Sequence, residues 1–246
     1  MQKTSKKHYG DPTISVCIAT CNGEKFIDAQ LSSIVSQSVP PAEIILVDDG
    51  SVDATVAIAE RILKTFQGHV QIEVHEKRLG VNKTFMQALS LSTQQIIVFC
   101  DQDDVWYSQR LKNIQKKFRA ERNDLLLTNA HIEENGRLTD RTLFGHLPPS
   151  AGFFSNLAKN HFVGCQIAIN RSLITAINKF PSDNFCFYDH CIAQKALWNG
   201  RLSFLTEPQG IYRRHSGTLT TISKRRSLLK VLASRVVLTF WLMFAQ

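Results

Sequence analysis

Apolar positions in the first hundred residues follow two alternating periods, which predict strands and helices in turn. Short runs of consecutive apolar residues alternate with segments whose apolar residues recur every three or four positions. We expect strands at 14–20, 43–47, 70–75 and 95–100, and helices at 24–37, 53–66 and 82–91. This alternation is typical of a mostly parallel sheet with helices on both faces. The predicted fold class is therefore α/β with a Rossmann-like sheet.

The second half of the chain is less regular. The pattern predicts helices at 108–118 and 187–199, and strands at 124–130 and 201–206. Gly200 is a good stop signal for the second of these helices. The stretch 131–153 contains Gly145 and two prolines and is expected to be rich in loops.

The composition indicates one globular domain. Hydrophobic residues make up 43% and charged residues 20% of the 246 residues, a balance that excludes a disordered chain. Residues 1–12 lack the apolar core of a signal peptide, and no apolar run reaches the roughly 20 residues that a spanning helix needs. The six cysteines form no CxxC pair and no zinc-finger spacing, so we expect reduced thiols in a cytoplasmic protein.

Two acidic clusters follow predicted strands. Asp48 and Asp49 follow the second strand, and the sequence Asp101-Gln-Asp-Asp follows the fourth. In parallel sheets ligands bind outside the carboxyl ends of the strands. Residues two apart in an extended segment point to the same side, so Asp101 and Asp103 can converge on one Mn²⁺ or Mg²⁺ ion. A solvated acidic turn that caps the next helix is the alternative.

Four segments in fixed order resemble a known family. They are ISVCIATCNGEKFI, IILVDDGSVDAT, KRLGVNKTF and IIVFCDQDDVW. Together they resemble the nucleotide-sugar half of family 2 inverting glycosyltransferases, which have the GT-A fold, and DQDDVW is similar to rhamnosyltransferase-like members. The resemblance implies a nucleotide-sugar-binding half at 13–107 and an acceptor-binding half at 108–215, between a polar tail at 1–12 and an amphipathic tail at 216–246.

The resemblance also implies roles for residues in the first half. Asp48 would accept a hydrogen bond from a pyrimidine, Asp49 would support its loop, and Asp103 would bind the metal. Asp101 would lie near both the ribose and the metal. The remaining nucleotide-sugar-binding residues that it implies are Thr20, Asn22, Lys77, Arg78 and Gln102. For Asp49 a turn-stabilising role, and for the two basic residues a solvated loop charge, remain open.

In the second half the resemblance maps Asp189 to the general base. The family usually has Glu-Asp followed by Arg and Gly, but here Tyr188 replaces the Glu and Lys195 replaces the Arg. A carboxylate suits the role because the acceptor hydroxyl must lose a proton during attack. A helix-capping aspartate is the alternative.

Further acceptor-side and metal residues follow from the same resemblance. Gly164 and Cys165 would line the acceptor pocket with Tyr188 and Trp198, although strand packing explains the first two equally well. His215 would bind the metal or the diphosphate. Arg213 or Arg214 would clamp phosphate oxygens. A surface histidine without a ligand is the alternative for His215.

The end of the chain combines two membrane signals. The net charge is +8, with basic clusters at both ends, and residues 223–246 are first basic and then apolar and aromatic. Such a helix can lie in an anionic membrane interface, with Trp241 and Phe244 inserted. A helix packed on the domain or on a partner subunit, as in a homodimer, is the alternative. We expect no nucleic-acid partner.

These observations predict a metal-dependent inverting glycosyltransferase using Mn²⁺ or Mg²⁺. It would transfer one sugar from a nucleotide-diphosphate donor, dTDP-rhamnose or a UDP-sugar, to a glycan or lipid-linked acceptor in surface polysaccharide or lipopolysaccharide synthesis. The segment 194–198 lacks the Gln-x-x-Arg-Trp motif of polymer-forming members. A non-catalytic sugar-nucleotide-binding or scaffold protein is the main alternative. A nucleotidyltransferase would need a Gly-rich loop, which 20–23 does not provide.

Overall fold

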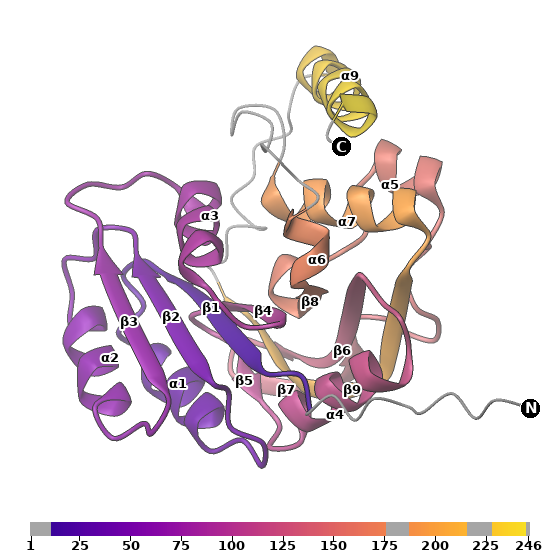
Figure 1. Cartoon of the computed structure of the whole chain (residues 1–246). Helices are drawn as coiled ribbons and strands as arrows, with labels where there is room; N and C mark the ends of the chain where they lie inside the picture. Colours follow the sequence, from indigo (N-terminus) through magenta and orange to yellow (C-terminus); the bar gives the residue numbers. More distant parts are fainter. Residues whose placement is uncertain (1–10, 176–186, 216–227, 245–246) are drawn as a thin grey trace, which may run out of the picture.

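A computed structural model describes residues 11–175, 187–215 and 228–244 (Figure 1). Its strands form a single sheet. They are β1 (Ile14–Thr20), β2 (Glu43–Asp48), β3 (His69–Val74), β4 (Ile96–Asp101), β5 (Val105–Trp106), β6 (Leu125–Glu134), β7 (Arg137–Thr142), β8 (Ile167–Asn170) and β9 (Leu202–Arg214). The helices are α1 (Ile27–Val35), α2 (Thr55–Leu63), α3 (Val81–Leu91), α4 (Arg110–Ala120), α5 (Phe153–Ala158), the 3₁₀ turn η1 (Gly164–Gln166), α6 (Arg171–Thr175), α7 (Tyr188–Asn199) and α9 (Leu228–Phe244).

The sheet has the strand order β3-β2-β1-β4-β8-β6-β9-β5, and β7 pairs with β6. Strands β3, β2, β1 and β4 run parallel, which brings their carboxyl ends to one edge. The pairing of β8 with both β4 and β6 is antiparallel, and β6 pairs in parallel with β9. The predicted α/β, mostly parallel sheet is confirmed, and it continues through both halves of the chain.

Each face of the sheet carries its own apolar cluster. Alternate residues of β1, β2 and β4 point to opposite faces, as strand geometry requires. One face packs against α1, α2 and α4, through residues such as Val16, Ile34 and Leu111. The other face packs against α3 and α7, through residues such as Phe85, Phe99 and Ile192. Burial on both faces explains why these strands are almost continuously apolar in sequence.

The second half departs from the sequence-based expectation in two places. The stretch expected to be loop contains the β6–β7 hairpin, whose turn residues Asn135 and Gly136 have φ values of 52° and 77°. Asn-Gly favours this two-residue turn because both positions accept a positive φ. The last strand extends to Arg214 instead of ending at Thr206, with register shifts in its pairing to β6 near Pro208. These irregularities let the strand continue past a proline.

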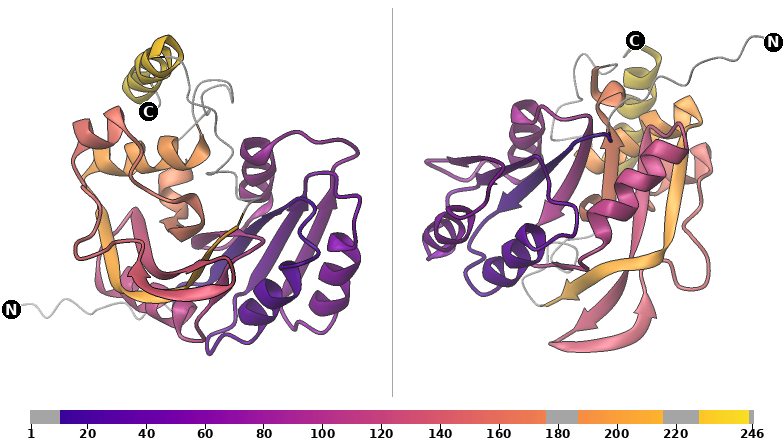
Figure 2. Two further views of the ribbon diagram at one scale, coloured as in Figure 1. Left: turned by 180° about the vertical axis from the view of Figure 1, so that it is seen from behind. Right: turned by 60° about the horizontal axis from the view of Figure 1, so that its bottom comes forward.

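The C-terminal helix α9 packs against the domain beyond α5 and α7 (Figures 1 and 2). Leu238 and Leu242 are buried against Cys191, and Trp241 packs against the same cluster. The predicted apolar C-terminal helix is present. However, Trp241 faces the domain, contrary to the expectation that it inserts into a membrane, and the Phe244 side chain lies outside the described residues. Within the described ranges, no helix has the length and apolar character needed to cross a bilayer.

Replacing Phe99 by alanine tests the apolar cluster on the α3 and α7 side of the sheet. Its ring is fully buried between Phe85 and Tyr188. Loss of a buried phenylalanine ring typically costs about 3–5 kcal/mol of the free energy of unfolding. Urea unfolding should show this loss for Phe99→Ala, whereas the exposed Val52→Ala control should change by less than about 0.5 kcal/mol. Equal stability of the two variants would contradict the described core.

Candidate active site

The turn after β2 is built around the carboxylate of Asp48. Its Oδ2 accepts hydrogen bonds from Thr20 Oγ1 at 2.7 Å and Ser51 Oγ at 2.6 Å, and its Oδ1 accepts one from the Ser51 amide at 2.7 Å. Asp48 is fully buried. The two strand ends, β1 and β2, are thus joined through side chains. These bonds use both carboxylate oxygens, so the predicted contact of Asp48 with a pyrimidine stays a prediction.

The loop after β1 is fixed from two sides. Asn22 has a φ of 50°, and its Oδ1 accepts a hydrogen bond from the Val52 amide at 3.0 Å. On the other side Gln102 bonds Cys21, with Oε1 accepting from the amide at 2.8 Å and Nε2 donating to the carbonyl at 3.2 Å. A Cβ at Gly23 would lie 2.3 Å from Gln102 Oε1, so a larger residue there would displace the Gln102 side chain from its bonds to Cys21. Gln102 therefore ties the ends of β1 and β4 together.

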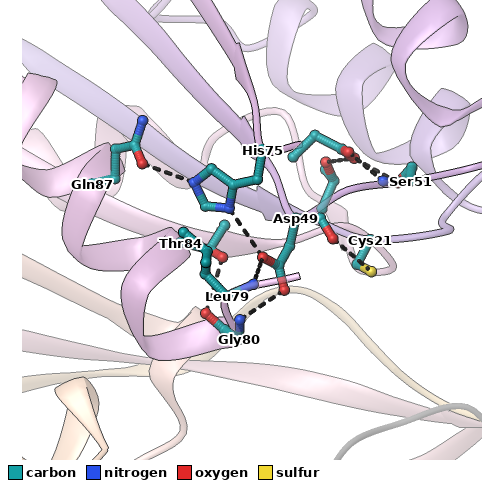
Figure 3. A network of polar contacts seen from close by, with 10 residues as sticks. Cys21, Asp49, Ser51, His75, Leu79, Gly80, Thr84 and Gln87 are labelled. Atoms are coloured by element: carbon teal, nitrogen blue, oxygen red, sulfur yellow. Dashed lines mark hydrogen bonds and ion pairs between the residues drawn. The ribbon is translucent and has the colours of Figure 1, made fainter. Parts of the chain in front are cut away.

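Asp49 organises the loop that carries Lys77 and Arg78 (Figure 3). Its Oδ1 accepts from the Leu79 amide at 2.6 Å and contacts His75 Nδ1 at 3.0 Å, and its Oδ2 accepts from the Gly80 amide at 2.9 Å. Asp49 is expected to support its own loop, after β2. Its bonds show that it also holds the loop after β3, through the amides of Leu79 and Gly80.

The Asp49–His75 pair is held in its charged form. Burial opposes ionisation of Asp49, but its hydrogen bonds from His75, Leu79 and Gly80 outweigh that effect and lower its pKa. Burial likewise disfavours a charged His75, but bonds to Asp49 and Gln87 raise its pKa. Since His75 Nε2 lies 2.8 Å from Gln87 Oε1, both ring nitrogens face acceptors, as an imidazolium requires.

The segment after β4 concentrates negative charge. Burial, together with the nearby carboxylates of Asp103 and Asp189, raises the pKa of Asp101 to about 7, against the lowering effect of a hydrogen bond with Cys165. Asp103 Oδ2 lies 2.8 Å from His215 Nε2, and the His215 ring stacks on Phe26 at a centroid distance of 4.4 Å. Residues 112 positions apart in the sequence thus form one polar pair at this strand end.

Next to this segment, the buried side chain of Gln166 connects Asp104 with Arg110. Burial raises the pKa of Asp104, whose oxygens accept from the Arg213 amide at 3.3 Å and Gln166 Nε2 at 3.4 Å. Arg110 donates to Gln166 Oε1 at 3.0 Å and to the Cys165 carbonyl at 3.1 Å. Through Gln166 and the Arg213 amide, the acidic segment is bonded to η1 and to β9. The Arg213 side chain itself pairs with Glu133 at 3.2 Å.

Asp189 lies in the first turn of α7. Its Oδ2 accepts a hydrogen bond from Asn160 Nδ2 at 3.0 Å, and its Oδ1 accepts one from the His190 amide at 2.7 Å. A Cβ at Gly164 would lie 2.3 Å from Tyr188 Oη and 3.4 Å from Asp189 Cβ. The 3₁₀ turn thus lies directly against the start of α7.

The structure brings most predicted second-half residues to one place and leaves one elsewhere. Tyr188 is buried between Phe85 and Phe99, at centroid distances of 4.5 and 5.2 Å. The predicted acceptor residue Trp198 lies near the other end of α7, where its ring packs on Phe153 at 5.6 Å. Nine residues of helix, roughly 13.5 Å at 1.5 Å per residue, therefore separate it from Asp189.

Four positioning residues escaped the sequence analysis: His75, Arg110, Asn160 and Gln166. Arg110 had a detectable signal, because it occupies an inward position of α4 next to Leu111 and Ile114. A buried arginine at such a position needs acceptors nearby. The other three lie in loops or short turns, where no periodicity marks a side chain as buried.

The chain matches one protein family over most of its length. The family model described as glycosyl transferase family 2 matches residues 15–177. The chain belongs to glycosyl transferase family 2. A dTDP-rhamnosyl transferase, RfbG of Shigella flexneri, is 34% identical to this family member over 100 residues, covering 39% of the chain and 35% of RfbG.

TarS of Staphylococcus aureus, a poly(ribitol-phosphate) beta-N-acetylglucosaminyltransferase, is 26% identical over 204 residues, which cover 80% of this family 2 chain. The chain spans only 35% of the length of TarS and of RfbG. A crystal structure of TarS residues 1–349 with UDP-GlcNAc superimposes with a TM-score of 0.75 at 22% identity, covering 95% of this chain and 67% of that chain.

The mannosyltransferase PcManGT of Pyrobaculum calidifontis, in complex with GDP-Man and Mn²⁺, superimposes with a TM-score of 0.64 at 18% identity. The match covers 96% of this chain and 72% of PcManGT. At this level of identity, these two structures show a shared fold.

The Asp49–His75 pair predicts a specific dependence of stability on pH. His75 has a raised folded pKa, so its contribution is complete below its ordinary pKa of 6.5 and is lost as the pH rises through the folded value. The contribution of Asp49 is complete above its ordinary 3.8 and is lost as the pH falls through its lowered pKa. Urea unfolding of wild type and His75→Gln across pH 5 to 9 should show the alkaline loss in the wild type alone. Parallel curves for the two proteins would contradict this prediction.

Proposed function

We propose that this family 2 protein is an inverting, divalent-metal-dependent glycosyltransferase of the hexosyltransferase type. It transfers a single sugar from a nucleotide-diphosphate donor to an acceptor hydroxyl. The observation that carries the proposal is the pair of Asp103 Oδ2 and His215 Nε2, 2.8 Å apart, at the carboxyl end of β4, where burial and the charges of Asp103 and Asp189 also raise the pKa of Asp101. Parallel sheets bind ligands at this edge. The family membership and the shared fold support the same conclusion.

In the proposed reaction Asp189 acts as the general base. The acceptor oxygen forms a bond to the anomeric carbon as the bond from that carbon to the diphosphate oxygen breaks. The acceptor proton passes to Asp189, and the nucleoside diphosphate leaves from the opposite face. Asn160 fixes the orientation of the Asp189 carboxylate through the bond to Oδ2. Tyr188, which stands where the family usually has Glu, supports the same turn by packing in the core.

The residues at this edge fit a bound Mn²⁺ or Mg²⁺ ion. Asp103 Oδ2 and His215 Nε2 lie 2.8 Å apart, and Asp101 brings a second carboxylate whose ionisation is opposed by burial and by the neighbouring charges. Oxygen and imidazole donors suit Mn²⁺, and few protein ligands suit an ion that also holds a diphosphate. Among the described residues no three acidic, histidine or cysteine side chains form a complete metal site. When bound, such an ion would stabilise negative charge on the leaving diphosphate.

We assign donor binding to residues 13–107 and acceptor binding to residues 108–215. Asp48 and Asp49, with Thr20 and Asn22, would form the nucleotide pocket. Lys77 and Arg78 would approach the nucleotide from the loop that Asp49 holds. The donor is dTDP-rhamnose or a UDP-sugar, as the names of RfbG and the TarS complex suggest. Further donor-side and acceptor-side residues of the proposal are Gln102, Arg213, Gly164, Cys165 and Trp198.

The proposed acceptor is a glycan or a lipid-linked glycan in surface polysaccharide or lipopolysaccharide synthesis. Among the relatives of this chain, TarS is by name a poly(ribitol-phosphate) beta-N-acetylglucosaminyltransferase, which acts on a polymer. We place the protein in the cytoplasm, attached peripherally to the inner face of the plasma membrane through its C-terminal helix. The alternative is that the same helix forms the interface of a homodimer. A non-catalytic sugar-nucleotide-binding protein is the competing function, because Tyr188 departs from the family pattern.

Two substitutions separate catalysis from donor binding. Asp189→Asn should lower the rate of sugar transfer by about 10²–10⁴-fold, the usual contribution of a general base, without weakening binding of UDP or dTDP in Mn²⁺. Asp103→Ala should weaken that binding. The exposed Asp140→Asn on β7 is the matched control and should leave both unchanged. The measurements are transfer and donor hydrolysis over a panel of nucleotide sugars, and calorimetric titration of the nucleotide.

The possible outcomes distinguish the two candidate functions. Nucleotide binding without transfer or hydrolysis of any donor by the wild type would support the non-catalytic alternative. Undiminished transfer by Asp189→Asn would remove Asp189 from its assigned role.

A further inference from the structure

Helix α9 has apolar side chains on two opposite faces, and in the described part of the chain only one of these faces is covered. The inner face buries Leu238 and Leu242, which are 0% and 2% exposed, against Cys191 of α7 and side chains of α5. Among the side chains of α9 that the structure describes, from 231 to 243, four large apolar ones are exposed. They are Leu232 (64%), Val236 (49%), Phe240 (58%) and Met243 (55%).

These four residues form a continuous outer stripe. Their spacings of four, four and three residues place them in one row along the helix. The residues between them on this side, Ala233 and Thr239, carry no charge. A helix on the surface of a water-soluble domain normally presents polar and charged residues to solvent. A row of large exposed apolar side chains therefore marks a binding surface.

The helix is anchored to the domain by more than apolar packing. Arg235 donates from Nε to the Ala158 carbonyl at 3.2 Å and from Nη1 to His190 Nδ1 at 3.1 Å. Arginine can only donate, so His190 accepts at Nδ1 and donates from Nε2 to the Asn156 carbonyl at 2.7 Å. His190 directly follows the proposed base Asp189. The orientation of the outer stripe is therefore fixed relative to the start of α7.

The charge of the C-terminal segment favours an anionic lipid surface as the occupant. Residues 216–246 contain five basic residues and no aspartate or glutamate. Basic residues are attracted to the negative surface of an anionic membrane and so add to the binding of an inserted apolar face. A second copy of this chain would bring the same positive segment to the interface, and like charges oppose such pairing. The positive charge of the segment and the exposed apolar side chains both favour an anionic membrane as the partner.

We propose that the outer stripe of α9 binds the surface of an anionic membrane and holds the domain there in one orientation. Membrane attachment itself does not depend on the proposed enzymatic activity. The role of this attachment does rest on the proposed function, because a fixed orientation would present the site near Asp189 to a lipid-linked acceptor.

Vesicle flotation with the full chain tests this proposal. Vesicles of phosphatidylcholine with one third phosphatidylglycerol should carry the wild type, and vesicles of phosphatidylcholine alone should carry much less. The variant Phe240→Glu/Met243→Glu should bind the anionic vesicles at least tenfold more weakly. The matched control Leu147→Glu/Leu138→Glu changes side chains that are 78% and 57% exposed and lie outside α9, and it should bind as the wild type does. Thermal unfolding confirms that all variants fold.

Several results would overturn the proposal. One is a wild type that does not bind anionic vesicles, and another is equal binding by the α9 variant. A third is a wild-type dimer, seen by light scattering, that the α9 variant converts to a monomer without any change in vesicle binding. Binding of UDP or dTDP is measured in parallel. Loss of vesicle binding with intact nucleotide binding isolates the membrane contact, whereas absence of nucleotide binding in every protein would instead count against the proposed function.

Discussion

Mutual repulsion of carboxylates at the end of β4 is the constraint around which the site is arranged. Asp101, Asp103 and Asp104 are consecutive or nearly so, and the start of α7 adds Asp189. Collecting these groups in a partly buried place costs free energy unless cations or hydrogen bonds compensate. The fold supplies part of that compensation through His215 beside Asp103, Asn160 on Asp189 and the buried link from Asp104 through Gln166 to Arg110. We interpret the remaining uncompensated charge as the basis for binding a cation.

The groups that compensate the negative charge come from several separate elements of the second half of the chain. His215 follows β9, Gln166 ends η1, and Asn160 lies between α5 and η1. The acidic segment therefore depends on correct placement of elements far away in the sequence. On the donor side, the loops after β1, β2 and β3 are joined in the same manner, by Gln102, Asp48 and Asp49. Polar side chains at strand ends, more than backbone contacts, connect the loops that form the site.

Much of the first half could be predicted from sequence, because buried parallel strands and amphipathic helices leave clear periods. The acidic residues were found for the same reason, since each cluster directly follows such a strand. The β6–β7 hairpin was missed although Asn135-Gly136 is a strong turn signal, because the alternation of polar and apolar residues in β7 is weak. The length of β9 could not be predicted, because pairing with β6 outweighs the break expected at Pro208. Asn160 and His75 act through hydrogen bonds to residues far away in the sequence, and such contacts leave no local pattern.

The central claim is that this corner of the sheet binds a divalent cation together with a nucleoside diphosphate. Crystals grown with Mn²⁺ and either UDP or dTDP, measured at the manganese absorption edge, test it most directly. The account predicts an anomalous peak next to the Asp103 carboxylate, with the diphosphate beside the metal and the base near the turn after β2. A nucleotide bound at this edge with no manganese near Asp103, or manganese and nucleotide bound elsewhere on the protein, would contradict it.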